Sequence, residues 1–296
     1  MAPQRQAYLY GIGAVLLWST VATAFKLSLR YLDTLQLLLY SCLSSILVML
    51  GILAVQGKLS AIWPLLKTDY RRWLLLGLLN PFGYYLILFQ AYDLLPAQQA
   101  QPLNYTWGIT LALLSIPLLG QRISRWEIIA CLISYLGVVV IATRGDLLAL
   151  QFDSPLGVAL ALVSTVIWAL YWILNTKNQH DPVVSLLLCF CFSLPFILAT
   201  TLIFSSVVVS DWRGLAGAFY VGVFEMGFAF VLWLSAMKRA TNTAKVSNLI
   251  FLSPFLSLYL IATFVGESIH PATYAGLLLI LAGVVLQSRL GGAKAG

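Results

Sequence analysis

Charged residues are scarce in this chain of 296 residues, where only 9% are Asp, Glu, Lys or Arg and 61% are hydrophobic. A soluble domain carries about a quarter charged residues, so the composition excludes an ordinary soluble protein. The net charge of +7 does not indicate nucleic-acid binding, because basic residues of a membrane protein gather in its cytoplasmic loops. The composition predicts an all-α protein that crosses the lipid bilayer many times.

Residue types that catalysis often needs are rare or poorly placed. The two histidines, His180 and His270, fall in connections between hydrophobic runs, which gives little support to a protease. No Walker loop is present, so the chain has no nucleotide-hydrolysing motif of its own. All four cysteines lie in apolar runs and are expected to be small core residues: Cys42, Cys131, Cys189 and Cys191. We therefore expect no enzyme activity, no cofactor and no metal.

Ten hydrophobic runs are about long enough to cross a membrane as helices, which takes about 20 residues each. The runs are Tyr8–Ser28, Thr34–Val55, Trp73–Tyr92, Ala97–Leu118, Trp126–Thr143, Pro155–Asn175, Val183–Val208, Arg213–Met237, Thr243–Phe264 and Pro271–Ser288. No cleavage-site pattern follows the first run, so we interpret it as a transmembrane helix and not as a signal peptide.

Lys and Arg are unevenly distributed among the connections. If the N-terminus is cytoplasmic, most of the 17 basic residues fall on the inner side. The outer side keeps Arg30, Arg144 and Arg213, with Lys26 near the end of the first run. Lys26 can extend toward the interface or, alternatively, anchor a substrate carboxylate. The positive-inside rule therefore predicts that both termini are cytoplasmic.

The two halves of the chain, residues 1–150 and 151–296, resemble each other. The aligned pairs include Gly77 with Gly222, Asn80 with Glu225, Trp18 with Trp168, and Gly137 with Gly283. A repeat of five helices has an odd number of crossings, so its second copy must be inserted in the opposite orientation. The sequence thus predicts ten transmembrane helices as two inverted five-helix repeats, an architecture typical of secondary transporters with a midplane substrate site.

Short motifs of the second half resemble the signature of the EamA units in the drug/metabolite transporter superfamily. The motifs are Ser253-Pro254-Phe255, Val265-Gly266-Glu267-Ser268 and Ala282-Gly283-Val284-Val285. Two EamA units in tandem would cover residues 1–150 and 151–296. Within the superfamily, the Asn-Tyr-x-Trp element at position 104 and the aromatic load resemble the YddG-type aromatic amino acid exporters.

This resemblance implies a bacterial inner-membrane exporter with a central cavity, a small-molecule substrate such as an amino acid, and no nucleic-acid partner. We expect a monomer. Glu267 matches the Gly-Glu position of the family, which implies a structural or gating role. Gly108 stands opposite Pro254 in the repeat, where the family has proline, and both are predicted gating residues.

The stretch 102–108 is unusually polar for its surroundings. It lies inside the hydrophobic run Ala97–Leu118, yet it holds an amide, a phenol, a hydroxyl and an indole. Unpaired polar groups cost several kcal/mol in hydrocarbon, so the segment must line a polar path or bond to a neighbouring helix. We favour the path, with Asn104, Tyr105 and Trp107 as substrate-binding residues.

Glu225 is the only acidic residue deep within a predicted span. A charge at that depth costs about 2.5–3.5 kcal/mol on insertion scales, so the carboxyl group should face a cavity or a partner. It can bind a substrate ammonium or exchange a proton, and the alternative is a hydrogen-bonded structural acid.

Aromatic residues recur at helical spacing in the run 155–175, where Trp168, Tyr171 and Trp172 share one face. Such rings can stack on an aromatic substrate or attract an ammonium, and the alternative is packing between helices. The predicted substrate-binding residues are Trp18, Asn80, Tyr84, Tyr85, Asn104, Tyr105, Trp107, Trp168, Tyr171, Trp172, Glu225, Phe228, Asn248 and Phe251.

These features favour a secondary transporter that exports small metabolites, with aromatic or apolar amino acids as the best substrates, by alternating access. One alternative is a sugar-phosphate or nucleotide-sugar antiporter, which should place Lys or Arg deep in several spans to meet phosphate. None lies at mid-depth here. A second alternative is a channel-like facilitator, which differs from a carrier in showing no saturable exchange.

Overall fold

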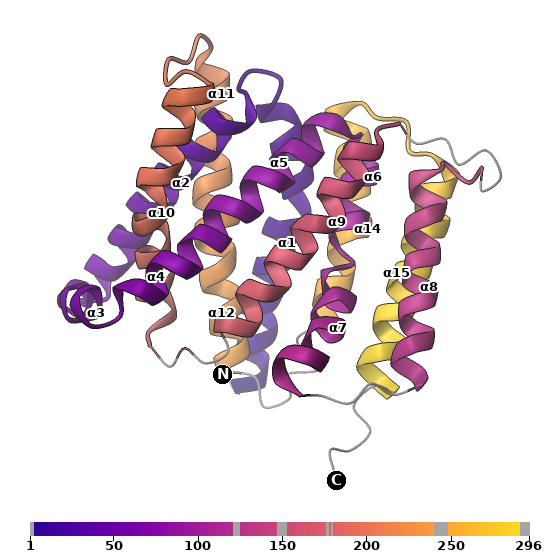
Figure 1. The fold of residues 1–296 in the computed structure, drawn as a ribbon, viewed down its shortest axis with the longest axis horizontal. Coiled ribbons are helices and arrows are strands. Elements are labelled where there is room, and N and C mark those ends of the chain that lie inside the picture. Colours follow the sequence, from indigo (N-terminus) through magenta and orange to yellow (C-terminus); the bar gives the residue numbers. More distant parts are fainter. Residues whose placement is uncertain are drawn as a thin grey trace. The chain divides into compact units, whose positions relative to one another are not determined.

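The computed structural model describes residues 3–120, 125–146, 153–175, 178, 180–239 and 248–290, and within these ranges every regular element is helical (Figure 1). The elements are α1 (Pro3–Ser28), α2 (Thr34–Val55), η1 (Leu59–Ala61), α3 (Ile62–Thr68), α4 (Tyr70–Gly77), η2 (Leu78–Gly83), α5 (Tyr84–Leu94), α6 (Ala97–Asn104), α7 (Trp107–Leu119), α8 (Arg125–Ala142), α9 (Pro155–Asn175), α10 (Pro182–Phe204), α11 (Trp212–Tyr220), η3 (Val221–Ala229), α12 (Phe230–Arg239), η4 (Asn248–Leu252), α14 (Ser253–Leu260), η5 (Ile261–Val265) and α15 (Pro271–Leu290).

Six of the helical stretches are long and apolar enough to cross a membrane. They are Gln4–Ser28, Thr34–Val55, Tyr70–Leu94, Pro155–Asn175, Pro182–Phe204 and Trp212–Ala236. Shorter apolar helices cover Ile128–Ala142, Ser253–Val265 and Pro271–Leu286. The all-α, membrane-spanning class expected from the composition is thus confirmed, with six clear spans within the described ranges.

Carboxylates set the starts of two of the long helices. Asp33 caps α2, where its side chain accepts hydrogen bonds from the amides of Leu35 and Gln36. Asp181 caps α10 and pairs with Lys58 over 2.7 Å. Partial burial alone would raise the pKa of Asp181, but the hydrogen bond from Lys58 and two backbone amides hold that pKa below its ordinary value.

The run Ala97–Leu118 does not form the continuous helix that its hydrophobicity predicts. It is broken at Tyr105 and Thr106 into α6 and α7. The Thr106 hydroxyl donates to the carbonyl of Leu103 over 2.7 Å, so the side chain competes for an acceptor that a continuous helix would use. Asn104 and Trp107 therefore lie on opposite sides of a break and do not belong to one continuous helix.

Two other expected helices change their winding in the middle. The segment η3, which holds Glu225, is π-helical, whereas η2 is a kink between two helices and holds Asn80, the residue that aligns with Glu225 between the two halves. In η2, Asn80 leaves helical geometry altogether, with φ −146° and ψ 119°, and Pro81 follows it without an amide donor. π-Helical turns inside α-helices are frequent at functional sites.

The helices pack into two units, and each unit takes helices from both halves of the chain. One unit consists of Met1–Phe89 and Gln179–Val265, and the other consists of Gln90–Asn178 and Gly266–Gly296. The first is unit 1 and the second is unit 2.

In unit 1, two glycines each lie close to a backbone carbonyl oxygen of a neighbouring helix. A Cβ on Gly77 would lie 2.4 Å from the carbonyl oxygen of Cys189, and one on Gly222 would lie 2.3 Å from that of Ser41. Gly77 and Gly222 align with each other between the two halves of the sequence. Ser41 and Cys189 also occupy matching positions, because each lies eight residues after the aspartate that caps its helix. Each of these two crossings therefore joins a glycine of one half of the chain to a helix of the other half.

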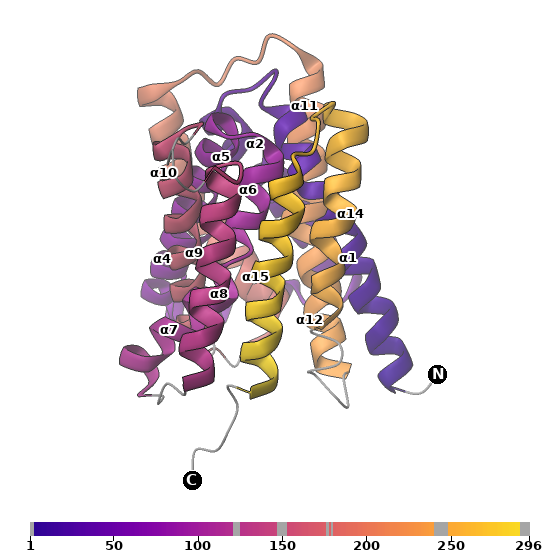
Figure 2. The same ribbon diagram turned by 90° about the vertical axis from the view of Figure 1, so that its right-hand side faces the viewer.

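Unit 2 repeats this pattern between α8 and α15, which run side by side in Figures 1 and 2. A Cβ on Gly137 would lie 2.5 Å from the carbonyl oxygen of Gly276, and one on Gly283 would lie 2.5 Å from that of Ala130. Gly137 and Gly283 align between the two halves of the sequence, and each of them lies against the backbone of the other helix. The small residues allow the backbones to approach closely, as is common between membrane helices.

The cysteines are free and differ in exposure. Cys42 and Cys189 are buried and Cys131 is half-buried, as expected of core residues, whereas Cys191 is exposed. The core placement expected for Cys191 was wrong, because the face of α10 that carries it is not covered within the described structure.

Candidate functional site

The carboxyl group of Glu225 is enclosed in unit 1 among aromatic side chains. Glu225 is only 9% exposed, although it lies in the middle of the stretch Trp212–Ala236. The hydroxyl of Tyr85 donates to its Oε1 over 3.1 Å, and the indole of Trp18 also directs a donor toward the carboxyl group. Its Oε2 is buried and has no hydrogen-bond partner in the described part of the chain.

Two groups of aromatic rings, one around Trp18 and one around Tyr85, adjoin this carboxyl group. The Trp18 ring lies 5.9 Å from Phe230, in an edge-on arrangement, and 5.3 Å from Trp233. In the second group, the ring of Tyr85 lies 4.9 Å from that of Tyr84. Apolar ring faces around an incompletely bonded carboxylate can hold a cationic group that carries an apolar or aromatic substituent.

Asn80 is a second incompletely bonded polar group in unit 1. Its side chain is fully buried, and neither Oδ1 nor Nδ2 has a hydrogen-bond partner among the described residues. A buried amide without partners costs about 1–3 kcal/mol, so it needs an explanation such as a ligand or a bound water.

In unit 2, the half-helix α6 ends at Asn104, which bonds to the neighbouring helix α9. The Nδ2 of Asn104 donates to the Oγ of Ser164 over 3.0 Å. One turn beyond the break, the hydroxyls of Thr110 and Thr165 lie 2.9 Å apart. Polar side chains from α6, α7 and α9 therefore meet where the chain between α6 and α7 is broken.

The aromatic face of α9 lies three to four residues beyond these contacts. Trp168 stacks on Tyr171 with ring centroids 5.7 Å apart, and it meets Trp172 edge-on at 5.8 Å. Trp168 is 8% exposed and Tyr171 is 4% exposed. The Nε1 of Trp172 is buried without a partner in the described residues, which leaves one donor of this face available.

The structure thus distributes the predicted substrate residues between two units. Unit 1 brings together Trp18, Tyr84, Tyr85 and Glu225, while Asn80 lies nearby in sequence on the same bent helix. Phe228, 39% exposed, packs on Phe224. Unit 2 brings together Trp168, Tyr171 and Trp172 on α9, and it places Tyr105 and Trp107, both half-buried, at the break after Asn104. The side chains of Asn248 and Phe251 lie outside the described residues.

Sequence reasoning missed the partners that complete these clusters. Ser164 and Thr165 precede the aromatic face of α9, and a small polar pair within an apolar helix could have indicated them. Phe230 and Trp233 lie at helical spacing from each other after Glu225, but nothing in that spacing distinguishes them from lipid-facing residues.

The two predicted gating residues occupy equivalent places in their helices. Gly108 is the second residue of α7, after the break, and Pro254 is the second residue of α14, after the 3₁₀ segment η4. Amides in the first turn of a helix have no carbonyl partner within it, so proline is well tolerated there.

We expect the substitution Gly108→Pro to change exchange rate more than folding. A Cβ at this position would lie 4.0 Å from a side-chain atom of Val284, the nearest among the described residues, so the added Cβ itself is not crowded. Proline fixes the backbone angle φ of residue 108, which should alter the motion at the break between α6 and α7. The maximal transport rate should therefore change by about twofold or more. The measurement compares the yield of monodisperse protein with the maximal transport rate in proteoliposomes, for the variant and the wild type. Equal losses of yield and rate would instead indicate a packing role.

Comparison with known proteins adds an independent finding. The family model described as the EamA-like transporter family matches residues 5–143 and again residues 155–289. An aromatic amino acid exporter, YddG, of Ancylobacter novellus is 26% identical over 275 residues, covering 90% of this chain and 91% of that protein. An uncharacterized transporter of Archaeoglobus fulgidus is 26% identical over 282 residues, covering 92% and 93%.

A more distant relative and a solved structure agree with these. A probable amino-acid metabolite efflux pump of Salmonella typhimurium is 25% identical over 226 residues, covering 71% of this chain and 74% of that protein. A crystal structure with a TM-score of 0.68 and 23% identity covers 96% of this chain and 97% of its own, and it supports the fold.

Proposed function

Because the chain belongs to the EamA-like transporter family, we propose that it is a secondary transporter that exports small metabolites, in particular aromatic and apolar amino acids. Members of this family are multi-pass membrane transporters and not enzymes, so a small-molecule substrate and a bilayer are its partners. We place it in a bacterial inner membrane as a monomer with both termini in the cytoplasm.

The observation that carries the substrate class is the environment of Glu225. A carboxylate oxygen without a partner, held in a span by Tyr85, is suited to the ammonium group of an amino acid. The surrounding rings of Trp18, Phe230 and Trp233 offer apolar faces to an aromatic or aliphatic side chain. The exporter and the efflux pump among the relatives are named for amino-acid cargo, which supports the same class.

Two inverted five-helix repeats, with ten spans in all, are the architecture that we propose for this transport. The exchanged contacts of Gly77 and Gly222 support it, as do those of Gly137 and Gly283, because two-fold related repeats make each crossing twice. The family model also matches the chain twice, once in each half. In this architecture, one repeat rocks against the other around a central substrate cavity, which gives alternating access.

The polar residues of unit 2 are a second group with the chemistry to bind such a substrate. Asn104 lies at the end of a half-helix, and unwound or broken membrane helices commonly provide substrate contacts. Trp168 and Tyr171 would stack on the cargo, while the buried Nε1 of Trp172 would donate to a carboxylate.

A sugar-phosphate antiporter and a channel-like facilitator are the competing functions. Phosphate recognition needs cationic side chains in the path, and Lys26 and Arg239 instead stand in or beside the last turns of α1 and α12. No observation in the described residues favours either alternative over a carrier of amino acids.

Counterflow in proteoliposomes tests the proposal. Vesicles loaded with unlabelled L-phenylalanine should accumulate labelled L-phenylalanine transiently and with saturation, and L-tryptophan or L-leucine should compete. Accumulation of a sugar phosphate instead, or uptake that rises linearly with concentration, would contradict an amino-acid carrier.

A further inference from the structure

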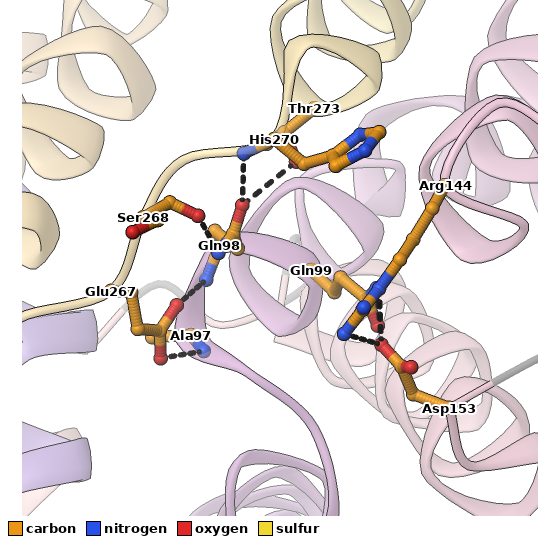
Figure 3. A network of polar contacts seen from close by, with 9 residues as sticks. All are labelled: Ala97, Gln98, Gln99, Arg144, Asp153, Glu267, Ser268, His270 and Thr273. Atoms are coloured by element: carbon orange, nitrogen blue, oxygen red, sulfur yellow. Dashed lines mark hydrogen bonds and ion pairs between the residues drawn. The ribbon is translucent and has the colours of Figure 1, made fainter.

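The first turn of α6 is capped by a carboxylate from a distant part of the chain. The two oxygens of Glu267 accept hydrogen bonds from the amides of Ala97, over 2.8 Å, and Gln98, over 3.1 Å (Figure 3). Pro96, directly before the helix, makes no side-chain cap of its own. A carboxylate at this position satisfies two amides without helical partners and complements the positive end of the helix dipole.

The Gln98 side chain fastens the same turn to the start of α15. Its Nε2 donates to the carbonyl of Ser268 over 2.9 Å. Its Oε1 accepts from the amide of His270 over 2.8 Å and from the hydroxyl of Thr273 over 3.2 Å. Figure 3 shows these bonds and those of Glu267 converging on one turn of α6 from the segment that leads into α15. Gln98 is 8% exposed, so its own amide group is shielded from competing water.

A third residue of the turn is tied to the segment before α9. The Nε2 of Gln99 donates to Asp153 over 2.8 Å, and Asp153 also pairs with Arg144 over 2.7 Å. Three consecutive residues, Ala97, Gln98 and Gln99, are therefore bonded to side chains or backbone outside their own helix (Figure 3). We call Glu267, Gln98, Gln99 and Asp153 the clasp.

The short helix α6 is held at both ends: the clasp bonds to its first turn, and its last residue, Asn104, bonds to α9. All residues of α6 from Ala97 to Leu103 are buried, and its last residue, Asn104, bonds to Ser164. Because α6 has only eight residues and ends at a break, the contacts at its two ends help to set its position. A shift at the first turn would be transmitted to Asn104 as a rigid-body movement.

We propose that Glu267 is a positioning residue: by capping α6, it sets the place of Asn104 in the substrate path and hence the affinity for substrate. The inference rests on the proposed function, because it assigns Asn104 to substrate. It differs from a general structural role in predicting a change in half-saturation at a nearly constant maximal rate.

The experiment compares Glu267→Ala and Glu267→Gln with Asp33→Asn in proteoliposomes that exchange labelled L-phenylalanine. Asp33 is a matched control, since it also caps a helix through two amides but belongs to α2. Glu267→Ala should raise the half-saturating concentration about fivefold, the factor that corresponds to a typical N-cap. Glu267→Gln retains one acceptor and should give a smaller rise, and it serves if the alanine variant does not fold. Asp33→Asn should leave half-saturation unchanged.

Hydrogen–deuterium exchange of the backbone amides provides a second measurement that needs no transport. The amides of Ala97 and Gln98 should exchange faster in both Glu267 variants and not in Asp33→Asn. Faster hydrogen exchange of these amides with an unchanged half-saturating concentration of L-phenylalanine would overturn the positioning role. An equal rise of the half-saturating concentration in the Asp33 variant would also overturn it. Absence of L-phenylalanine exchange by the wild type would overturn the proposed function, and the positioning role with it, whatever the amides show.

Discussion

Glu225→Gln is expected to lower the exchange of L-phenylalanine by about tenfold or more, since removing one partner of a buried charged contact commonly costs a few kcal/mol. The substitution keeps the size of the side chain and its acceptor for Tyr85, but it removes the negative charge. The loss should therefore come from the missing attraction for the substrate ammonium and not from a change in packing.

The response to pH makes this prediction sharper. A carboxyl group that also exchanges a proton makes wild-type transport vary with pH, whereas the amide that replaces it in the variant does not ionise. The wild type and the variant are compared at several pH values in vesicles with and without a pH gradient. Exchange by the variant at the wild-type rate, at every pH, would contradict a substrate or proton role for Glu225.

Tyr85→Phe is the matched control for this site. It removes the 3.1 Å hydrogen bond to Oε1 and keeps both the ring and the charge of Glu225. The expected loss is smaller than that of Glu225→Gln, because the negative charge that attracts the substrate ammonium stays and only one of its hydrogen bonds is removed. Equal losses in the two variants would indicate that the hydrogen bond, and not the charge, is what transport needs.

Gly222→Val is expected to have the largest effect on stability. Even a Cβ there would lie 2.3 Å from the carbonyl oxygen of Ser41 and 2.6 Å from the side chain of Ser44. Since a backbone carbonyl cannot rotate away, the two helices must separate, and overpacking of this kind costs about 1–3 kcal/mol or more. The expected result is a lower midpoint of thermal unfolding in detergent and a reduced yield of monodisperse protein.

The same chain offers both a control and a symmetry test. Gly51 lies in α2 with no atom within 4 Å of a Cβ, so Gly51→Val should leave the midpoint nearly unchanged. Gly77→Val should lower the midpoint about as much as Gly222→Val does, because its Cβ would meet the carbonyl oxygen of Cys189 at 2.4 Å. Tolerance of valine at position 77 but not at 222 would argue against equivalent packing of the two halves.

Much of the fold follows from local sequence. The spans of α2 and α9 agree with the hydrophobic runs Thr34–Val55 and Pro155–Asn175, because a capping aspartate or a proline marks where each apolar run begins. The breaks in other runs were not predicted. The hydrophobicity of a segment does not depend on whether its backbone winds as an α-, π- or 3₁₀-helix. It therefore cannot indicate that Asn80 leaves helical geometry or that the chain turns at Tyr105.

By itself, the sequence determined that this chain is helical and embedded in a membrane, that its halves are similar, and that one acid lies deep in a span. These features depend on composition and spacing, which do not require knowledge of distant contacts. Only the tertiary structure decided which groups meet: Tyr85 bonds to Glu225 from 140 positions away, and Glu267 caps Ala97 from 170 positions away. Such pairs form because helices distant in sequence pack side by side, and no local pattern specifies which buried polar groups that packing brings together.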